Sequence, residues 1–273
     1  MKTLDTLAQW PVDHVCAAVL TADGVLGVHG DADRQYELAS VTKLLVAQAV
    51  LVAVEEGAVE LDTAAGLPGA TVAHLLAHAS GMAFDKREAA AGVAEQRIYS
   101  SAGFEVLADL VAAESQISFD EYLREAVCEP LGMRSTGLFG PAGHGARSTV
   151  ADLTAFAAEL LSPQLISTEL AKRAHSVQYP GLDGFVPGYG KHRPNDWGLG
   201  FEVRGHKAPH WTAPDHSPST FGHFGQAGTF LWVDPARRAA AVVLTDRPFG
   251  PWAKPLWSEF NQQILGELSG LSG

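Results

Sequence analysis

Cysteine is scarce in this chain, which holds only Cys16 and Cys128 among its 273 residues. Domains that depend on disulfides carry a denser set of cysteines, so no disulfide framework is implied. Both cysteines stand among apolar neighbours. We therefore expect each of them to be a small buried side chain.

Long apolar runs are also missing. The longest extends from Leu44 to Val54, contains Gln48 and is too short to span a bilayer. The first twenty residues carry one lysine and the acids Asp5 and Asp13, without the sustained apolar run of a secretory signal. These features predict a cytoplasmic protein.

Positive charge is in deficit, because 19 lysines and arginines face 31 aspartates and glutamates, for a net charge of −12. A surface this acidic argues against nucleic acid or an anionic membrane as a partner. The hydrophobic content of 47% is that of an ordinary folded protein. The length is sufficient for one large domain with a substantial core.

Strand patterns lie towards both ends of the chain, and helical patterns lie between them. The runs HVCAAVL and GVLGVHG flank Ala22-Asp23-Gly24, a hairpin signal. Strands are predicted at 14–20, 24–30, 197–204, 221–235 and 237–246, and helices at 3–9, 40–56, 71–78, 101–114, 118–128, 149–161 and 256–268. Residues 178–197 are rich in glycine and proline and are predicted to form a functional flap.

This order predicts an α/β (α+β) fold in which strands from both chain ends form one antiparallel sheet flanked by terminal helices. An all-helical lobe is inserted between them. We expect one domain over 1–273, with a sheet lobe from 1–35 and 176–273 and a helical lobe from 36–175. The active site would lie in the cleft between the lobes.

The segment ELASVTKLLVAQAV carries the clearest chemical signal. Ser40 and Lys43 are three residues apart at the start of a predicted helix, so both side chains fall on one face. Unpaired N–H groups at a helix start favour negative charge on a nucleophile and its adduct. A partly desolvated lysine has a lowered pKa and can accept the serine proton. Alone, this spacing is a weak signal, since Ser40 could be a helix cap and Lys43 an exposed lysine.

The surrounding motifs make the spacing specific. The segments TVAHLLAHASGM (71–82), EPLGMRSTG (129–137) and GHFGQAGTFLWVDP (222–235) resemble, in order, segments of the penicillin-binding proteins and class C β-lactamase-like serine hydrolases. Tyr99-Ser100-Ser101 falls where that family carries Tyr-x-Asn. The resemblance covers nearly the whole chain and implies a β-lactamase/transpeptidase-like fold.

The resemblance also implies roles for individual residues. Ser40 would be the nucleophile, Lys43 its activator, and Tyr99 a second proton-transfer group that could be a phenolate or share a proton with Lys43. His223 would support Tyr99 and face the leaving group. The oxyanion hole would consist of the backbone N–H groups of Ser40 and Gln226.

Two departures from the family pattern bear on the substrate. Ser101 replaces the usual asparagine, and His223-Phe224-Gly225 replaces Lys-Thr-Gly. Both changes remove polar groups that would bind a peptide-like substrate, and Phe224 would form an apolar wall. Flap residues such as Tyr189 and Trp197 are expected to line an apolar acyl pocket, so we expect a substrate-binding set of Ser101, Phe224, Gly225, Tyr189 and Trp197.

The pattern favours a hydrolase that acts on a small-molecule ester or amide without a cofactor, by acylation and deacylation of Ser40, with esters of apolar acyl groups preferred. A β-lactamase or a D-alanyl or D-amino-acid peptidase is an alternative, and a non-catalytic relative that binds a ligand or partner is another. His74 and His78 have helix-face spacing for zinc but lack the glutamate of hydrolytic sites, and a histidine-rich stretch from 206 to 223 lacks regular ligand spacing. No metal site is expected.

Overall fold

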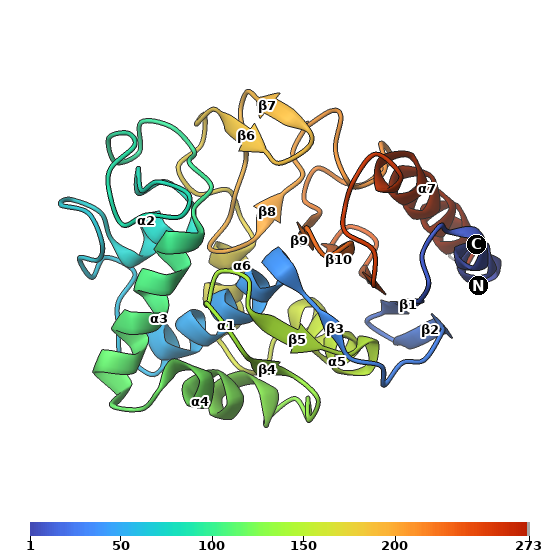
Figure 1. Ribbon diagram of the computed structural model, residues 1–273, viewed down its shortest axis with the longest axis horizontal. Coiled ribbons are helices and arrows are strands. Elements are labelled where there is room, and N and C mark those ends of the chain that lie inside the picture. Colours follow the sequence, from blue (N-terminus) through green and yellow to red (C-terminus); the bar gives the residue numbers. More distant parts are fainter. Residues whose placement is uncertain (272–273) are drawn as a thin grey trace.

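A six-stranded antiparallel sheet forms the centre of the computed structural model, which describes residues 1–271. Its strand order is β2-β1-β11-β10-β9-β8, so strands from the two ends of the chain lie side by side (Figure 1). The bounds are β1 (Val15–Thr21), β2 (Gly24–His29), β8 (Glu202–Val203), β9 (Phe221–Gly225), β10 (Thr229–Asp234) and β11 (Ala239–Thr245). The predicted sheet from both chain ends is confirmed.

Alternate residues of these strands enter two separate cores, because successive strand side chains point to opposite faces of the sheet. One face packs against η1 (Lys2–Gln9) and α7 (Ala253–Leu271), at the right in Figure 1. Its members include Val19, Phe224 and Trp257. The other face carries Leu231 and Val242 against the helices of the middle segment. The parity of each strand position therefore decides which core its side chain enters.

Helices dominate the middle of the chain, and the almost completely buried α1 (Thr42–Glu55) runs through their centre. Around it lie α2 (Val72–Leu76), α3 (Ser101–Ser115), α4 (Phe119–Leu123), η3 (Arg124–Cys128), α5 (Val150–Leu161) and α6 (Thr168–Ala174). α1 is buried along most of its length, polar Lys43 and Gln48 included, as expected of a predominantly apolar central helix.

The middle segment also holds a small three-stranded sheet, so the expectation of an all-helical lobe is wrong in this detail. Its strand order is β3 (Tyr36–Glu37), β5 (Ala146–Ser148) and β4 (Gly137–Leu138). These strands are two or three residues long, too short to produce a recognisable alternation in sequence. They bring the 137–148 segment against the chain just before Ser40, which proves important for the site.

Several predicted boundaries change in the structure. The predicted strand at 221–235 is two strands, β9 and β10, joined by a tight turn over 226–228. The predicted strand at 197–204 reduces to β8, and α6 was not expected. The flap contains a short hairpin, β6 (Gly184–Val186) with β7 (Gly190–His192). The free, buried cysteines agree with their predicted role.

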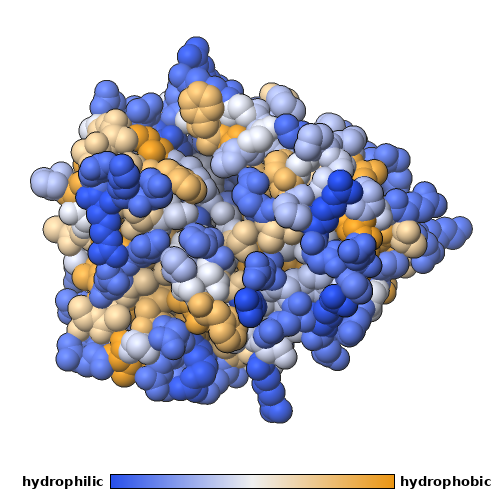
Figure 2. Space-filling model, in the orientation of Figure 1, coloured by the Kyte–Doolittle hydropathy of each residue, from blue (hydrophilic) through white to orange (hydrophobic). Residues whose placement is uncertain are grey.

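On the face shown in Figure 2, hydrophilic and hydrophobic side chains surround a hollow near the centre of the molecule. Within residues 1–271, the helices are each too short or too polar to cross a membrane.

Candidate active site

Ser40 lies in η2 (Ala39–Val41), a single 3₁₀ turn that leads directly into α1. The preceding residue, Ala39, has a φ of 46°, a left-handed conformation that is costly for a residue with a Cβ. The end of β9 packs against this turn, and a Cβ on Gly225 would lie 2.2 Å from the carbonyl oxygen of Leu38. Glycine at 225 is therefore needed for close approach of the strand to the turn that carries Ser40.

Lys43 lies one turn into the helical segment and is completely buried. Its Nζ donates hydrogen bonds to the Ser101 Oγ at 3.1 Å and to the Gly143 carbonyl oxygen at 2.7 Å, and it lies 4.5 Å from the centre of the Tyr99 ring. Burial lowers the pKa of Lys43 to about 7, although the negative charge of Glu105 opposes this shift. A substantial fraction of the lysine is thus a neutral amine near neutral pH.

Tyr99 connects Ser40 to His223. The His223 Nδ1 lies 2.6 Å from the carbonyl oxygen of Phe224, which can only accept, so Nδ1 carries the proton. Burial lowers the pKa of His223 to about 3, so the ring is neutral and its Nε2 is an acceptor. The Tyr99 hydroxyl, 3.2 Å from Nε2, therefore donates to His223.

Burial raises the pKa of Tyr99 above its usual value, and the nearby Ser40 hydroxyl opposes this shift. The arrangement therefore consists of the Tyr99 hydroxyl, near Ser40, donating to the neutral His223 ring. It favours a protonated tyrosine, so the expectation that Tyr99 could be a phenolate has no support here.

His78 packs against Tyr99 and holds the chain next to it. The sequence predicted only a structural role for His78. Its Nδ1 accepts a hydrogen bond from the Ser100 backbone N–H at 3.1 Å, and its ring packs 4.7 Å from that of Tyr99. Ser100 caps α3, since its side chain accepts a hydrogen bond from the Gly103 N–H. His78 thereby holds the chain at the residue that follows Tyr99.

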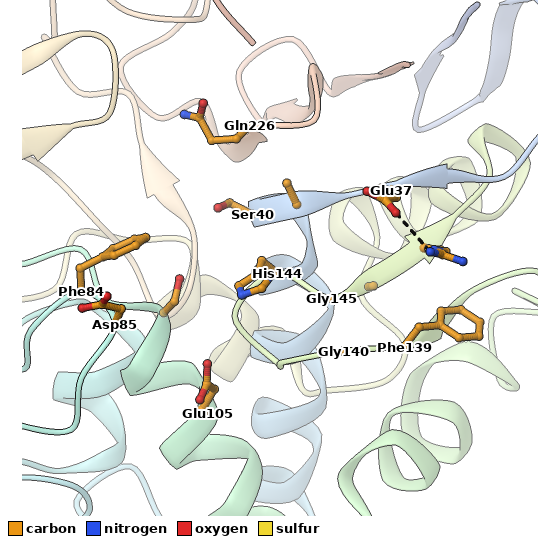
Figure 3. Close-up of a pocket in the computed structure, with 14 residues that line it drawn as sticks. Glu37, Ser40, Phe84, Asp85, Glu105, Phe139, Gly140, His144, Gly145 and Gln226 are labelled. Carbon is orange, nitrogen blue, oxygen red and sulfur yellow. Dashed lines mark hydrogen bonds and ion pairs between the residues drawn. The ribbon is translucent and has the colours of Figure 1, made fainter. Parts of the chain in front are cut away.

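A cavity of about 540 Å³ opens above Ser40. Figure 3 shows Phe84, Asp85 and Glu105 on one side of it, Phe139 on the other, and His144 between them below Ser40. The lining residues are Glu37, Ala39, Ser40, Phe84, Asp85, Ser101, Glu105, Phe139, Gly140, His144, Gly145, Ala146, Arg147 and Gln226. The volume suits a small-molecule substrate.

Comparison with known proteins places this geometry in a family. Residues 15–264 match the family model described as Beta-lactamase. The chain belongs to the β-lactamase family. Its fold resembles the crystal structure of a β-lactamase from Mycobacterium bovis, with a TM-score of 0.97 and 56% identity over 97% of this chain and 99% of the other.

Other β-lactamase-like proteins are more distant. Simvastatin synthase from Aspergillus terreus (LovD6 mutant) has a TM-score of 0.78 at 15% identity, over 98% of this chain and 94% of the other, which is a likeness of fold. A "putative D-alanyl-D-alanine carboxypeptidase" of Salmonella enteritidis is 38% identical over 76 residues, 27% of this chain. That alignment spans only 18% of the curated relative's length.

Not every residue expected to bind substrate lies at the cavity of this β-lactamase-family protein. Phe224 follows His223 in β9, so its side chain is on the opposite face of the sheet, where it packs 5.0 Å from Phe249 and 6.0 Å from Trp257, measured between ring centres. It forms no wall of the cavity. Tyr189 packs in the same core.

Trp197 lies behind the catalytic groups. It is buried, and its ring centre is 5.8 Å from that of Tyr99 and 5.4 Å from that of His223. Ser101 and Gln226 do line the cavity. The residues of the lining that the motifs did not identify, such as Phe84, Phe139 and His144, lie in irregular segments without periodicity.

The histidines weighed as metal ligands have other partners. The His74 Nδ1 lies 2.8 Å from the Thr71 hydroxyl, and His210 hydrogen-bonds Thr212 and Glu202. Across residues 1–271, no group of three or more histidine, cysteine or acidic side chains is arranged to hold a metal ion.

Proposed function

We propose that this protein is a serine hydrolase that forms an acyl-enzyme on Ser40 and acts on carboxylic esters with apolar acyl groups. The observation that carries the proposal is the buried Lys43 amine, held by Ser101 and Gly143 three residues after Ser40, with a pKa lowered to about 7. A neutral amine at this place can act as a general base near neutral pH.

In the acylation step, the Ser40 Oγ attacks the ester carbonyl carbon and loses its proton. We assign that proton to the Lys43 amine, which lies 4.5 Å from the centre of the Tyr99 ring, with Tyr99 positioned beside both residues. The C–O bond to the alcohol then breaks, and the leaving alkoxide takes the proton from the Lys43 ammonium and departs as the alcohol. Water repeats the sequence on the acyl-enzyme and releases the acid and free Ser40.

The backbone N–H groups of Ser40 and Gln226 are proposed as the oxyanion hole. Both residues line the cavity, Ser40 in the turn before α1 and Gln226 in the turn after β9. Two N–H groups aimed at the developing oxyanion contribute on the order of 3 kcal/mol each to transition-state stabilisation.

The preference for apolar acyl groups rests on Phe84 and Phe139, which line the cavity with 55% and 64% of their surface exposed. They provide the apolar surface that Phe224 does not. Ser101 is occupied with Lys43, and the family's asparagine amide is missing at this position. A peptide-like acyl group therefore finds fewer polar partners.

The second candidate is a β-lactamase or D-alanyl peptidase, favoured by the names of the Mycobacterium and Salmonella relatives. A non-catalytic binding protein is a third reading. The Tyr99 hydroxyl, which lies near Ser40 and donates to the neutral His223 ring, supports an enzyme instead.

Two measurements test the proposal. A fluorophosphonate probe should add once to the intact protein, as seen by mass spectrometry, and Ser40→Ala should abolish the adduct. The kcat/KM for p-nitrophenyl butyrate should exceed that for nitrocefin and for a D-alanyl dipeptide. Labelling that survives Ser40→Ala would contradict the nucleophile, and a tenfold preference for nitrocefin or the peptide would establish the second candidate.

A further inference from the structure

Two carboxylates of the cavity, Asp85 and Glu105, lie on one wall of it (Figure 3). The arginines of this region are engaged elsewhere, since Arg147 pairs with Glu37 at 3.1 Å and Arg87 with Asp109 at 2.6 Å. Among residues 1–271, neither Asp85 nor Glu105 has an ion pair within 4.0 Å. This wall consequently presents two acidic side chains to whatever occupies the cavity, although Glu105 also acts on the buried Lys43, whose pKa it raises.

Backbone hydrogen bonds fix the chain segment that carries Asp85 against the start of α3, the helix that carries Glu105. The Phe84 carbonyl oxygen accepts from the N–H groups of Ser101 at 2.8 Å and Ala102 at 3.1 Å, which fixes the 84–85 segment at the start of α3. Glu105 follows Ser101 by four residues on α3, so both point to the same side of the helix. Asp85 and Glu105 thus have defined places relative to the catalytic Lys43 and Ser101.

An aromatic face accompanies the carboxylates. Phe84 is 55% exposed and adjoins Asp85 at the mouth of the cavity. An aromatic ring next to a carboxylate is the combination that binds ammonium groups, because the ring face and the acid both attract a positive charge. On the opposite side, the Phe139 ring is already covered by the Arg147 guanidinium at 5.5 Å.

The acidic wall continues beyond the catalytic cavity. A second cavity of about 370 Å³ shares Glu105 and Gly140 with the first and is also lined by Asp120 and by Asp109 with its ion-pair partner Arg87. Glu105 therefore lies where the two cavities meet, with room for a substrate group that extends past it.

We propose that the site selects esters that carry a positive charge, an ammonium or related group a few bonds from the scissile carbonyl, with Asp85 and Glu105 as specificity-determining residues. This inference rests on the proposed function and names its substrate class more closely. The same two carboxylates oppose the negatively charged carboxylate of β-lactams and of D-alanyl peptides.

Isosteric substrate pairs test the charge preference. One pair places the charge in the acyl group, p-nitrophenyl 4-(trimethylammonio)butanoate against p-nitrophenyl 5,5-dimethylhexanoate. The other places it in the leaving group, acetylthiocholine against 3,3-dimethylbutyl thioacetate. In at least one pair the cation should have the higher kcat/KM, and the ratio should fall as salt is raised to about 0.5 M.

Charge-neutralising variants locate the effect. Asp85→Asn and Glu105→Gln should each lower the cation-to-neutral ratio by about three- to tenfold, the effect of one partly exposed charge at short range. Glu114 lies at the exposed end of α3 and lines neither cavity. Glu114→Gln removes the same charge, so its cation-to-neutral ratio should match that of the wild type. A ratio below one in both pairs, or a ratio that Asp85→Asn and Glu105→Gln leave unchanged, would overturn the proposal.

A binding measurement separates this inference from the proposed function. If the neutral esters prove not to be substrates, the esterase proposal fails, and the charge preference is then read from protection of Ser40 against the fluorophosphonate probe. Choline should protect better than its neutral isostere 3,3-dimethylbutanol, and Glu105→Gln should remove the difference. Equal protection by the two alcohols would contradict the inference.

Discussion

The Tyr99 hydroxyl lies near Ser40 and donates a hydrogen bond to His223. Tyr99→Phe keeps the ring that packs on His78 but removes this hydroxyl. We expect kcat to fall by about 10²–10⁴. A His223→Phe variant and the double variant, measured with the same ester, complete the test.

The double variant should lose far less than the product of the two single losses, because residues that act as one unit are not additive. Losses that multiplied would mean that Tyr99 and His223 act independently. The thermal unfolding midpoint of each variant provides the control for misfolding.

The pH dependence of activity should report Lys43 rather than His223. With the neutral amine as the proposed base, kcat/KM should rise as pH increases through about 7, the lowered pKa of Lys43. His223, with a pKa near 3, stays neutral throughout this range. Because Glu105 raises the Lys43 pKa, Glu105→Gln should shift the rising limb to lower pH. A limb that stayed in place in Glu105→Gln would contradict this assignment.

Sequence reasoning is strongest for residues that are neighbours along the chain and weaker for those that are not. Ser40 and Lys43 are three apart, and helical geometry alone brings them to one face. Tyr99 and His223 are 124 residues apart, and only the resemblance to a family connected them. The Gly143 carbonyl that holds Lys43 comes from an irregular segment, where residue type predicts little about position.

At the level of single elements, β9 shows how the wrong prediction for Phe224 could have been avoided. Strand side chains alternate between faces, so a strand that presents His223 to the site must direct Phe224 away from it. Parity applied to 221–225 would have excluded Phe224 from the cavity. The turn at 226–228 lies within a segment that reads as one continuous strand, so it was recognised only from the structure.

The position of Phe224 leads to a prediction about stability. Phe224→Ala should lower the free energy of unfolding by about 3–5 kcal/mol, because it leaves a cavity among aromatic rings beneath α7. The kcat/KM for p-nitrophenyl butyrate should change little at temperatures where the variant is folded. Urea unfolding and steady-state kinetics measure the two effects.

Phe84→Ala is the matched control, since Phe84 is exposed and lines the cavity. It should leave the unfolding midpoint nearly unchanged and raise the KM for apolar esters. The reverse pattern, with Phe224 controlling KM, would restore the original expectation for that residue.

At the scale of the whole molecule, buried histidines make the fold sensitive to acid. Burial lowers the pKa of His175, His216 and His223 to about 3 each. In the unfolded chain these rings bind protons below about pH 6.5. Stability is therefore complete above that pH and is lost as pH falls towards 3, by about 2 kcal/mol for each histidine at pH 5.

Urea midpoints measured from pH 8 to pH 5 check this expectation. His175 stacks 4.0 Å from Phe221 in an apolar site, so His175→Leu should make the decline less steep. A urea midpoint that stayed constant between pH 7 and pH 5 would contradict the lowered pKa values of these buried histidines.

The pairing of β1 with β11 has a consequence for how the chain assembles. Val15 lies opposite Thr245 and Thr21 opposite Ala239, so more than 200 residues separate the partners of one ladder. During synthesis on a ribosome, the β1–β2 hairpin emerges early, and the β1 edge that pairs with β11 stays unpaired until β11 is made. Contacts this distant along the chain are slow to form. Synthesis must therefore be nearly complete before β9, which carries His223, lies in the complete sheet. Only then can β9 support the turn that carries Ser40.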